Sequence, residues 1–131
     1  MHHDRFAIVT LAASALFIAG PAPAADVGAE VTNAAMHAGL AAQASDIGTV
    51  HAHLHHAVNC LVGPAGAGFD AKELNPCANT GNGAIPDSSN AQSKQTLGAA
   101  LAKANDGIAA TDLGTAQKDA SEAASMIKTV K

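Results

Sequence analysis

Alanine dominates this chain beyond residue 25, where large side chains are scarce. Phe69 is the only aromatic residue in that part, because the sequence has no Trp or Tyr and its other two phenylalanines are Phe6 and Phe17. Much of the interior must therefore be alanine, whose burial removes little area from water at roughly 25 cal/mol per Å². Ordering the backbone costs about 1–2 kcal/mol per residue. A core this thin requires an additional constraint to hold the fold together.

Apolar residues recur at three- and four-residue steps in two segments, which is the pattern of one buried helix face. The first segment contains Ile47, Val50, Leu54, Ala57, Val58 and Leu61, and the second contains Leu113, Ala116, Ala120, Ala123, Ala124, Ile127 and Val130. Another alanine-rich helical stretch precedes each segment, at about 27–44 and about 89–106. The pattern predicts four helices.

The segment 45–61 aligns with the segment 111–127, with identical residues at four positions. Both segments begin with Ser or Thr followed by Asp, and this shared start supplies side-chain oxygens that can cap the start of a helix. We call this alignment the repeat register. It predicts two similar helical hairpins. We therefore expect an all-α fold, an up-down four-helix bundle made of these hairpins and joined by a long Gly/Pro/Asn loop, residues 63–87.

The segment 1–25 is typical of a signal peptide. A short start with one arginine leads into an apolar run at 6–19, and the Gly-Pro-Ala-Pro segment at 20–23 then stops any helix. The run is too short to span a bilayer, which takes about 20 apolar residues. We expect cleavage after Ala24 or Ala25. The product is then an exported protein, periplasmic or secreted, whose residues 26–131 form a single alanine-rich helical domain.

The charge balance excludes several partners. The whole chain has a formal net charge of −4, and removing the segment 1–25, with Asp4 and Arg5, leaves that value unchanged. No basic stripe is present to replace the counterions of phosphates, so nucleic acid is not expected as a partner. The same balance gives no reason to expect binding to an anionic membrane.

The loop at 63–87 is rich in the turn formers Gly, Pro and Asn. A structureless connection of this length is unusual in a compact domain unless it is functional or disordered. The only two cysteines are Cys60, at the end of the second helix, and Cys77, in the loop. In an oxidising compartment we expect a disulfide between them, contributing about 3 kcal/mol in the chain-entropy model. The alternative is a thiolate ligand, or a nucleophile at Cys60 with His56 as its base.

Histidine is concentrated in the second helix, which carries His51, His53, His55 and His56 close together. At 100° per residue, His51 and His55 fall on one shoulder of the buried face as an i,i+4 pair. His53, His56 and Cys60 fall on the other shoulder. Neutral imidazoles one turn apart can share one ion, and they suit Cu²⁺, Zn²⁺ and Ni²⁺.

His37, on the first helix, is a candidate third ligand if the first two helices pack so that it faces one shoulder. The alternative interpretation of the cluster is a polar, partly exposed helix face without a ligand. Where the first copy has histidines, the second copy has Gln117, Asp119, Ser121 and Glu122. We therefore expect no metal on the fourth helix.

Two other ligand sets are weaker candidates. The loop oxygens do not have the spacing of an EF-hand, so solvated turn residues are the expectation for Asp70, Glu73, Asn75, Asn79, Asn82 and Asp87. Two methionines, Met36 and Met126, could bind reduced copper or haem, but with almost no aromatic residues available we expect both in the core.

The alanine-rich helices with Asp-Leu-Gly-Thr-like starts, in residues 45–61 and 111–127, resemble the small metal-binding proteins of bacterial periplasms. Those are histidine-rich four-helix proteins that bind copper and other divalent ions. The resemblance covers both hairpins but not the loop, and it implies a helical bundle, a periplasmic location and a divalent metal ion. The histidines of this chain to which the resemblance could assign the family's role as metal ligands are His51, His53, His55 and His56. This chain departs from the family in confining histidine almost wholly to one helix and in having a disulfide loop.

Two functions remain open from the sequence. The first is a periplasmic buffer or chaperone for copper, zinc or nickel, with affinity falling between about pH 7 and pH 5 as imidazoles are protonated. A site built on one histidine pair leaves coordination positions open, which favours metal-induced self-association. The alternative is an exported interaction or structural protein whose disulfide-tied loop contacts a partner. An enzyme is not expected, because no paired acid and base and no phosphate-binding loop can be placed.

Overall fold

The computed structural model describes residues 24–131, and in that part of the chain it contains five helices and no strand. Their bounds are α1 Val27–Gln43, α2 Ile47–Val62, α3 Ala84–Asp87, α4 Ala91–Ala109 and α5 Leu113–Lys128. The predicted signal peptide lies outside the described residues except for Ala24 and Ala25. Helix α3 was not predicted from the sequence, because a single short turn within a loop has no periodicity to detect.

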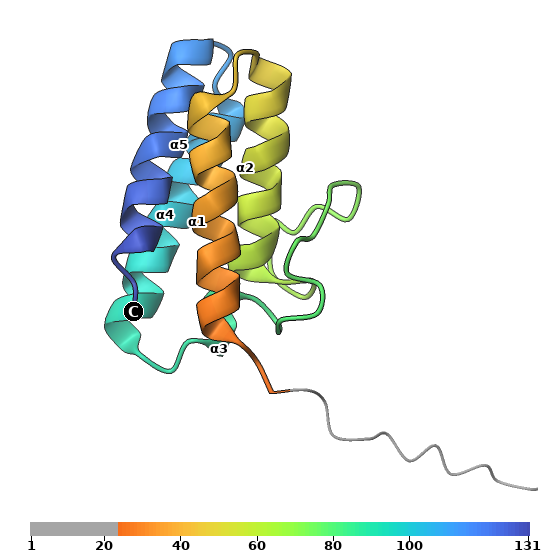
Figure 1. The fold of residues 1–131 in the computed structure, drawn as a ribbon, viewed down its shortest axis with the longest axis vertical. Helices are drawn as coiled ribbons and strands as arrows, with labels where there is room; N and C mark the ends of the chain where they lie inside the picture. Colours follow the sequence, from red (N-terminus) through yellow and green to blue (C-terminus); the bar gives the residue numbers. More distant parts are fainter. Residues whose placement is uncertain (1–23) are drawn as a thin grey trace, which may run out of the picture.

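The four long helices form a helical bundle (Figure 1). Helix α1 packs against α2 and α5, and α4 packs against α5 and α2, while α2 and α5 also contact each other. Within residues 24–131 no helix is long and apolar enough to cross a membrane. The all-α prediction is confirmed.

Each long helix begins at an Asp or Asn whose side chain accepts a backbone N–H from the first helical turn. These N-caps are Asp26, Asp46, Asn90 and Asp112. The oxygen satisfies one of the N–H groups that the first turn leaves without a partner, and such a cap is worth about 1 kcal/mol. The Ser/Thr-Asp starts of the repeat therefore act as predicted from the sequence.

The core consists mainly of alanine. The larger fully buried apolar side chains are Val50, Leu54, Val58, Leu61, Leu97 and Ile127. In the repeat register, the five buried apolar positions of α2 from Val50 to Leu61 that recur at helical spacing align with buried positions of α5, where mostly smaller residues stand: Ala116, Ala120, Ala123, Ala124 and Ile127. The same pattern of burial in both copies supports the predicted repeat.

The two methionines differ in their surroundings. Met126 is partly buried and packs against the core, as expected. Met36 is 50% exposed on α1, so its predicted place in the core is wrong. On α1 small alanines supply the buried stripe, Ala34, Ala38 and Ala41, and Met36 falls outside that stripe.

Candidate metal centre

Three histidines from two helices meet on one side of the α1–α2 pair. His37 comes from α1, and His53 and His56 come from successive turns of α2. Each offers one ring nitrogen, and these three nitrogens all lie within 4.8 Å of one another. Helices α1 and α2 therefore pack so that His37 faces the shoulder that carries His53 and His56, which is the condition that made it a candidate third ligand.

The spacing of the nitrogens is close to what a metal requires. Nδ1 of His37 lies 3.2 Å from Nδ1 of His53. Two nitrogens bound to one tetrahedral Zn²⁺ at about 2.0–2.1 Å are about 3.3 Å apart. The most distant pair must close by up to about 1.5 Å to reach that geometry. Three protein ligands would leave a fourth position open, as in zinc sites that exchange a ligand rather than in closed structural sites.

The cluster favours neutral imidazoles. His37 is only 8% exposed, and burial, followed by the neighbouring His56 and His53, lowers its pKa to about 4. Burial and His53 also lower the pKa of His56, although Glu73 opposes this change. Because a metal binds the neutral ring, these two histidines are ready to bind at a pH at which an exposed histidine is already partly protonated.

Glu73, in the loop, supports His56. Its Oε2 lies 3.5 Å from Nε2 of His56, while Nδ1 of His56 is buried without a hydrogen-bond partner. A carboxylate that accepts the proton of one imidazole nitrogen leaves the lone pair on the other nitrogen for a metal. This contact selects the tautomer with the proton on Nε2.

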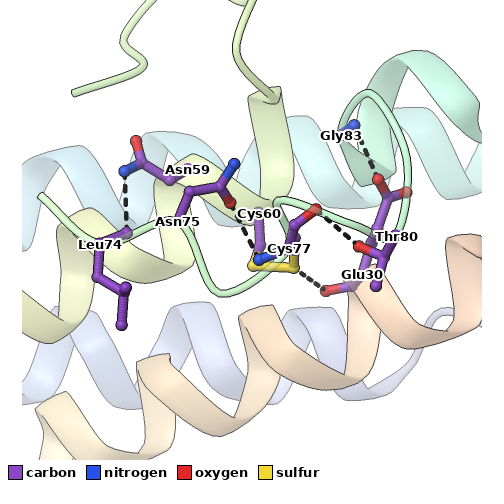
Figure 2. Close-up of a disulfide and its surroundings, with 8 residues drawn as sticks. All are labelled: Glu30, Asn59, Cys60, Leu74, Asn75, Cys77, Thr80 and Gly83. Carbon is purple, nitrogen blue, oxygen red and sulfur yellow. Dashed lines mark hydrogen bonds between the residues drawn. A yellow bond between two sulfur atoms is a disulfide. The ribbon is translucent and has the colours of Figure 1, made fainter. Parts of the chain in front are cut away.

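The loop is held at this place by Asn59, a fully buried residue of α2. Its Nδ2 donates to the carbonyls of Asp70 and Leu74 at 2.9 and 3.1 Å, and its Oδ1 accepts the N–H of Asp70 at 2.8 Å. The predicted disulfide, Cys60 with Cys77, is confirmed and lies directly beside Asn59 (Figure 2). These two anchors fix the loop segment that carries Glu73.

The structure places His51 and His55 away from this cluster. Nε2 of His51 lies 3.0 Å from the carbonyl of Ala110 and donates its proton to it. Nδ1 of His55 lies 3.7 Å from a carboxylate oxygen of Asp70. The predicted i,i+4 pair therefore does not join the three-histidine group, whereas the predicted i,i+3 pair does.

The repeat gives His51 a structural role. Its counterpart in the repeat register is Gln117, whose Nε2 donates to the carbonyl of Ala44 at 2.8 Å. Ala44 and Ala110 are the C-cap residues of α1 and α4, and they also correspond in this register. Each copy thus supplies one side-chain N–H to a carbonyl at the end of the other copy's first helix. Carbonyls at helix ends lack partners within the helix, so both residues satisfy the same need.

The histidine cluster also has a counterpart in the second hairpin. Continued through both hairpins, the repeat register places Lys103, Asp119 and Glu122 at the positions of His37, His53 and His56. Nζ of Lys103 lies 3.4 Å from Asp119 Oδ1 and 3.2 Å from Glu122 Oε2. In one copy the three positions hold a cation between two carboxylates. In the other copy they hold three ring nitrogens and no cationic side chain.

No family model, curated protein or solved structure matches this chain. The resemblance to the periplasmic small metal-binding proteins therefore stays a prediction.

Sequence reasoning missed the role of Glu73, which was expected to be a solvated turn residue. It also gave no special role to Asn59. A polar residue on the buried side of α2, next to Cys60, was a usable signal, because a buried amide must find hydrogen-bond partners and the only long loop follows this helix.

Burial of the cluster predicts that the metal-free protein loses stability in mild acid. The pKa of His37 falls from 6.5 to about 4 on folding, so between these values the unfolded chain binds more protons than the folded one. The free energy of unfolding should therefore decrease as the pH falls from 6.5 to about 4, by up to about 3 kcal/mol, since each pKa unit corresponds to about 1.4 kcal/mol.

Guanidinium unfolding of chelator-treated protein at about pH 7, 5.5 and 4.5, across the interval between the two pKa values, measures this loss. His37→Gln is the control, because it keeps a polar side chain and cannot titrate. If that variant loses as much stability in acid as the unchanged protein, His37 is not the responsible group.

Proposed function

We propose that this chain is an exported, periplasmic protein that binds a divalent copper, zinc or nickel ion through His37, His53 and His56. It serves as a metal buffer or chaperone and has no enzymatic activity. Its scaffold is an up-down four-helix bundle, an arrangement supported by the short α1–α2 and α4–α5 connections. Nucleic acids and membranes are not among its partners.

One observation carries the proposal, namely three ring nitrogens from α1 and α2 within 4.8 Å of one another. Copper, zinc and nickel all bind neutral imidazole readily. The lowered pKa values of His37 and His56 keep these rings neutral. They also move the loss of metal to lower pH than the range of about 7 to 5 expected from ordinary histidines.

The second hairpin adds support. There Lys103 supplies the positive charge at the equivalent positions, and the two carboxylates raise its pKa. The cluster of the first hairpin contains no such charged side chain. A metal cation from solution can therefore take the position between its three rings. The disulfide and the predicted signal peptide agree with an oxidising compartment outside the cytoplasm.

Calorimetric titration of the mature protein with Cu²⁺, Zn²⁺ and Ni²⁺ tests this function. We expect one ion per chain with micromolar or tighter affinity at about pH 7.5, and weaker binding below about pH 5 as His37 is protonated. Size-exclusion chromatography with and without metal shows whether the open position recruits a second molecule. No binding of any of the three ions at micromolar concentration would falsify the proposal.

A second candidate function is an interaction surface on the loop. Leu74 is 61% exposed there, and Asn59 holds its backbone in place. An exposed large apolar residue on a fixed loop is suited to contact a protein partner, although a single one is also common on surfaces.

Substitution of Glu73 separates the two roles of the loop. Glu73→Gln should weaken metal binding about tenfold, because carboxylates that orient a ligating histidine typically contribute about 10–100-fold to affinity. Asp70→Asn is the matched control, since Asp70 faces His55 outside the cluster. Isothermal titration measures both variants. Equal affinities in the two would show that the loop does not assist the metal site.

A further inference from the structure

A buried carboxylate near the start of α1 lacks a partner for one of its oxygens. Glu30 is fully buried, and its Oε1 accepts the N–H of Gly83 at 2.8 Å (Figure 2). Its Oε2 is buried without a hydrogen-bond partner. An ionised carboxylate in such a place is costly unless a cation pairs with it.

The surroundings of Glu30 are acidic. Burial raises its pKa, and Asp87 and Asp26 raise it further, while the Gly83 N–H opposes them. Among residues 24–131 no lysine, arginine or histidine forms an ion pair with any of these three carboxylates. The site therefore has an excess of negative charge.

Residues 25 and 26 lie at the same place. A Cβ built on Gly81 would lie 2.6 Å from Oε1 of Glu30 and 3.1 Å from Cβ of Ala25, and it would also meet the carboxylate of Asp87. The N–H of Asp26 donates to the carbonyl of the residue before Gly81, at 2.6 Å. The backbone at 25–26 is thus held beside Gly81, which is also a neighbour of the Glu30 carboxylate.

We propose that the α-ammonium group created by removal of the signal peptide, on Ala25 or Asp26, binds at this site and pairs with Glu30. A signal peptidase hydrolyses the peptide bond after Ala24 or Ala25 with one water molecule. The signal peptide leaves with a new carboxylate, and the mature chain keeps the amine. With a reference pKa of about 7.7–8.0, that amine is protonated at neutral pH.

Processing then completes the folded state. Before cleavage the nitrogen is an uncharged amide, and Glu30 has no cation. After cleavage the ammonium group supplies the missing positive charge between Glu30 and Asp87. The site lies where the start of α1 meets the loop at Gly81. The inference rests on the export in the proposed function and is independent of the metal site.

The test compares two exported forms of the full chain. Intact mass of the periplasmic protein identifies its first residue. In the variant, Gly-Ser is inserted between Ala25 and Asp26, which keeps the cleavage site and moves the amine away from Glu30. We expect the variant to unfold at a lower guanidinium concentration than the natural mature protein. Glu30→Gln in both forms should abolish the difference between them.

A second readout does not depend on stability. The α-amine is reductively dimethylated with ¹³C-formaldehyde and cyanoborohydride as the hydride donor, which keeps a titratable amine, and its pKa is followed by NMR. Pairing with Glu30 should raise that pKa by about one unit relative to the Gly-Ser variant, since a nearby opposite charge favours the charged form. Glu30→Gln should return it to the ordinary value.

Three results would overturn the proposal. One is an amine with the same pKa in both forms. Another is a mature protein that still carries the segment 1–25. A third is recovery of the variant's stability by Na⁺ or Ca²⁺ alone, which would make the site one for a free cation. Loss of metal binding in the histidine variants affects none of these readouts, so the two proposals can fail separately.

Discussion

Replacing His37, His53 and His56 together by alanine should lower the affinity for Cu²⁺, Zn²⁺ and Ni²⁺ by about 100-fold or more. The change removes every ring nitrogen of the cluster, and a single supporting residue beyond the ligands already contributes about 10–100-fold to affinity. Helicity should stay nearly intact, because the three rings lie beside the alanine core and the N-caps of α1 and α2 are untouched. Isothermal titration and circular dichroism measure the two outcomes.

The matched control is the pair His51→Ala with His55→Ala, which removes the same kind of residue from the same helix. These side chains contact Ala110 and Asp70 and not the cluster, so metal affinity should change little. A small loss of stability is expected, because the carbonyl of Ala110 loses its donor. If the control loses binding and the triple variant keeps it, the site lies on the other shoulder of α2.

The repeat offers a gain of function in the same experiment. Changing Lys103, Asp119 and Glu122 to histidine copies the cluster into the corresponding positions of the second hairpin. We expect the number of bound ions per chain to rise from one to two. An unchanged stoichiometry in a folded variant would mean that three histidines at these positions are not sufficient to form the site.

The sequence allowed prediction of the helices and of the shoulders of α2, because helical geometry alone places His53 and His56 together. It did not determine which helix faces each shoulder. Helix α2 has long neighbours on both sides. The angular position of a residue around α2 does not show which of these helices it faces. His37 was therefore a conditional candidate until the packing of α1 was known.

His51 shows where a usable signal was overlooked. The repeat register already paired it with Gln117, and histidine and glutamine share the ability to donate an N–H to a carbonyl. A structural role at the ends of α1 and α4 followed from that pairing. The place of Glu73 was not predictable in this way, since it depends on the path of a loop fixed by tertiary contacts with Asn59.

The disulfide is expected to have a large effect on stability. Reducing Cys60–Cys77 should lower the free energy of unfolding by about 3 kcal/mol in the chain-entropy model, given the sequence separation of 17. Domains have a total stability of about 5–15 kcal/mol, and a core made mainly of alanine has little reserve. Guanidinium unfolding with and without reductant, at fixed pH and without metal, measures the difference as a lower midpoint.

The double variant Cys60→Ala with Cys77→Ala is the control for the reductant. It should match the reduced protein in stability and show no further response to reductant. Cys60 is fully buried and Cys77 nearly so, so alanine removes two sulfur atoms and leaves only small gaps. If the oxidised and reduced proteins unfold at the same midpoint, the hydrogen bonds of Asn59 hold the loop in place without the disulfide. The additional constraint that an alanine core requires must then come from the loop's polar contacts, and not from its crosslink.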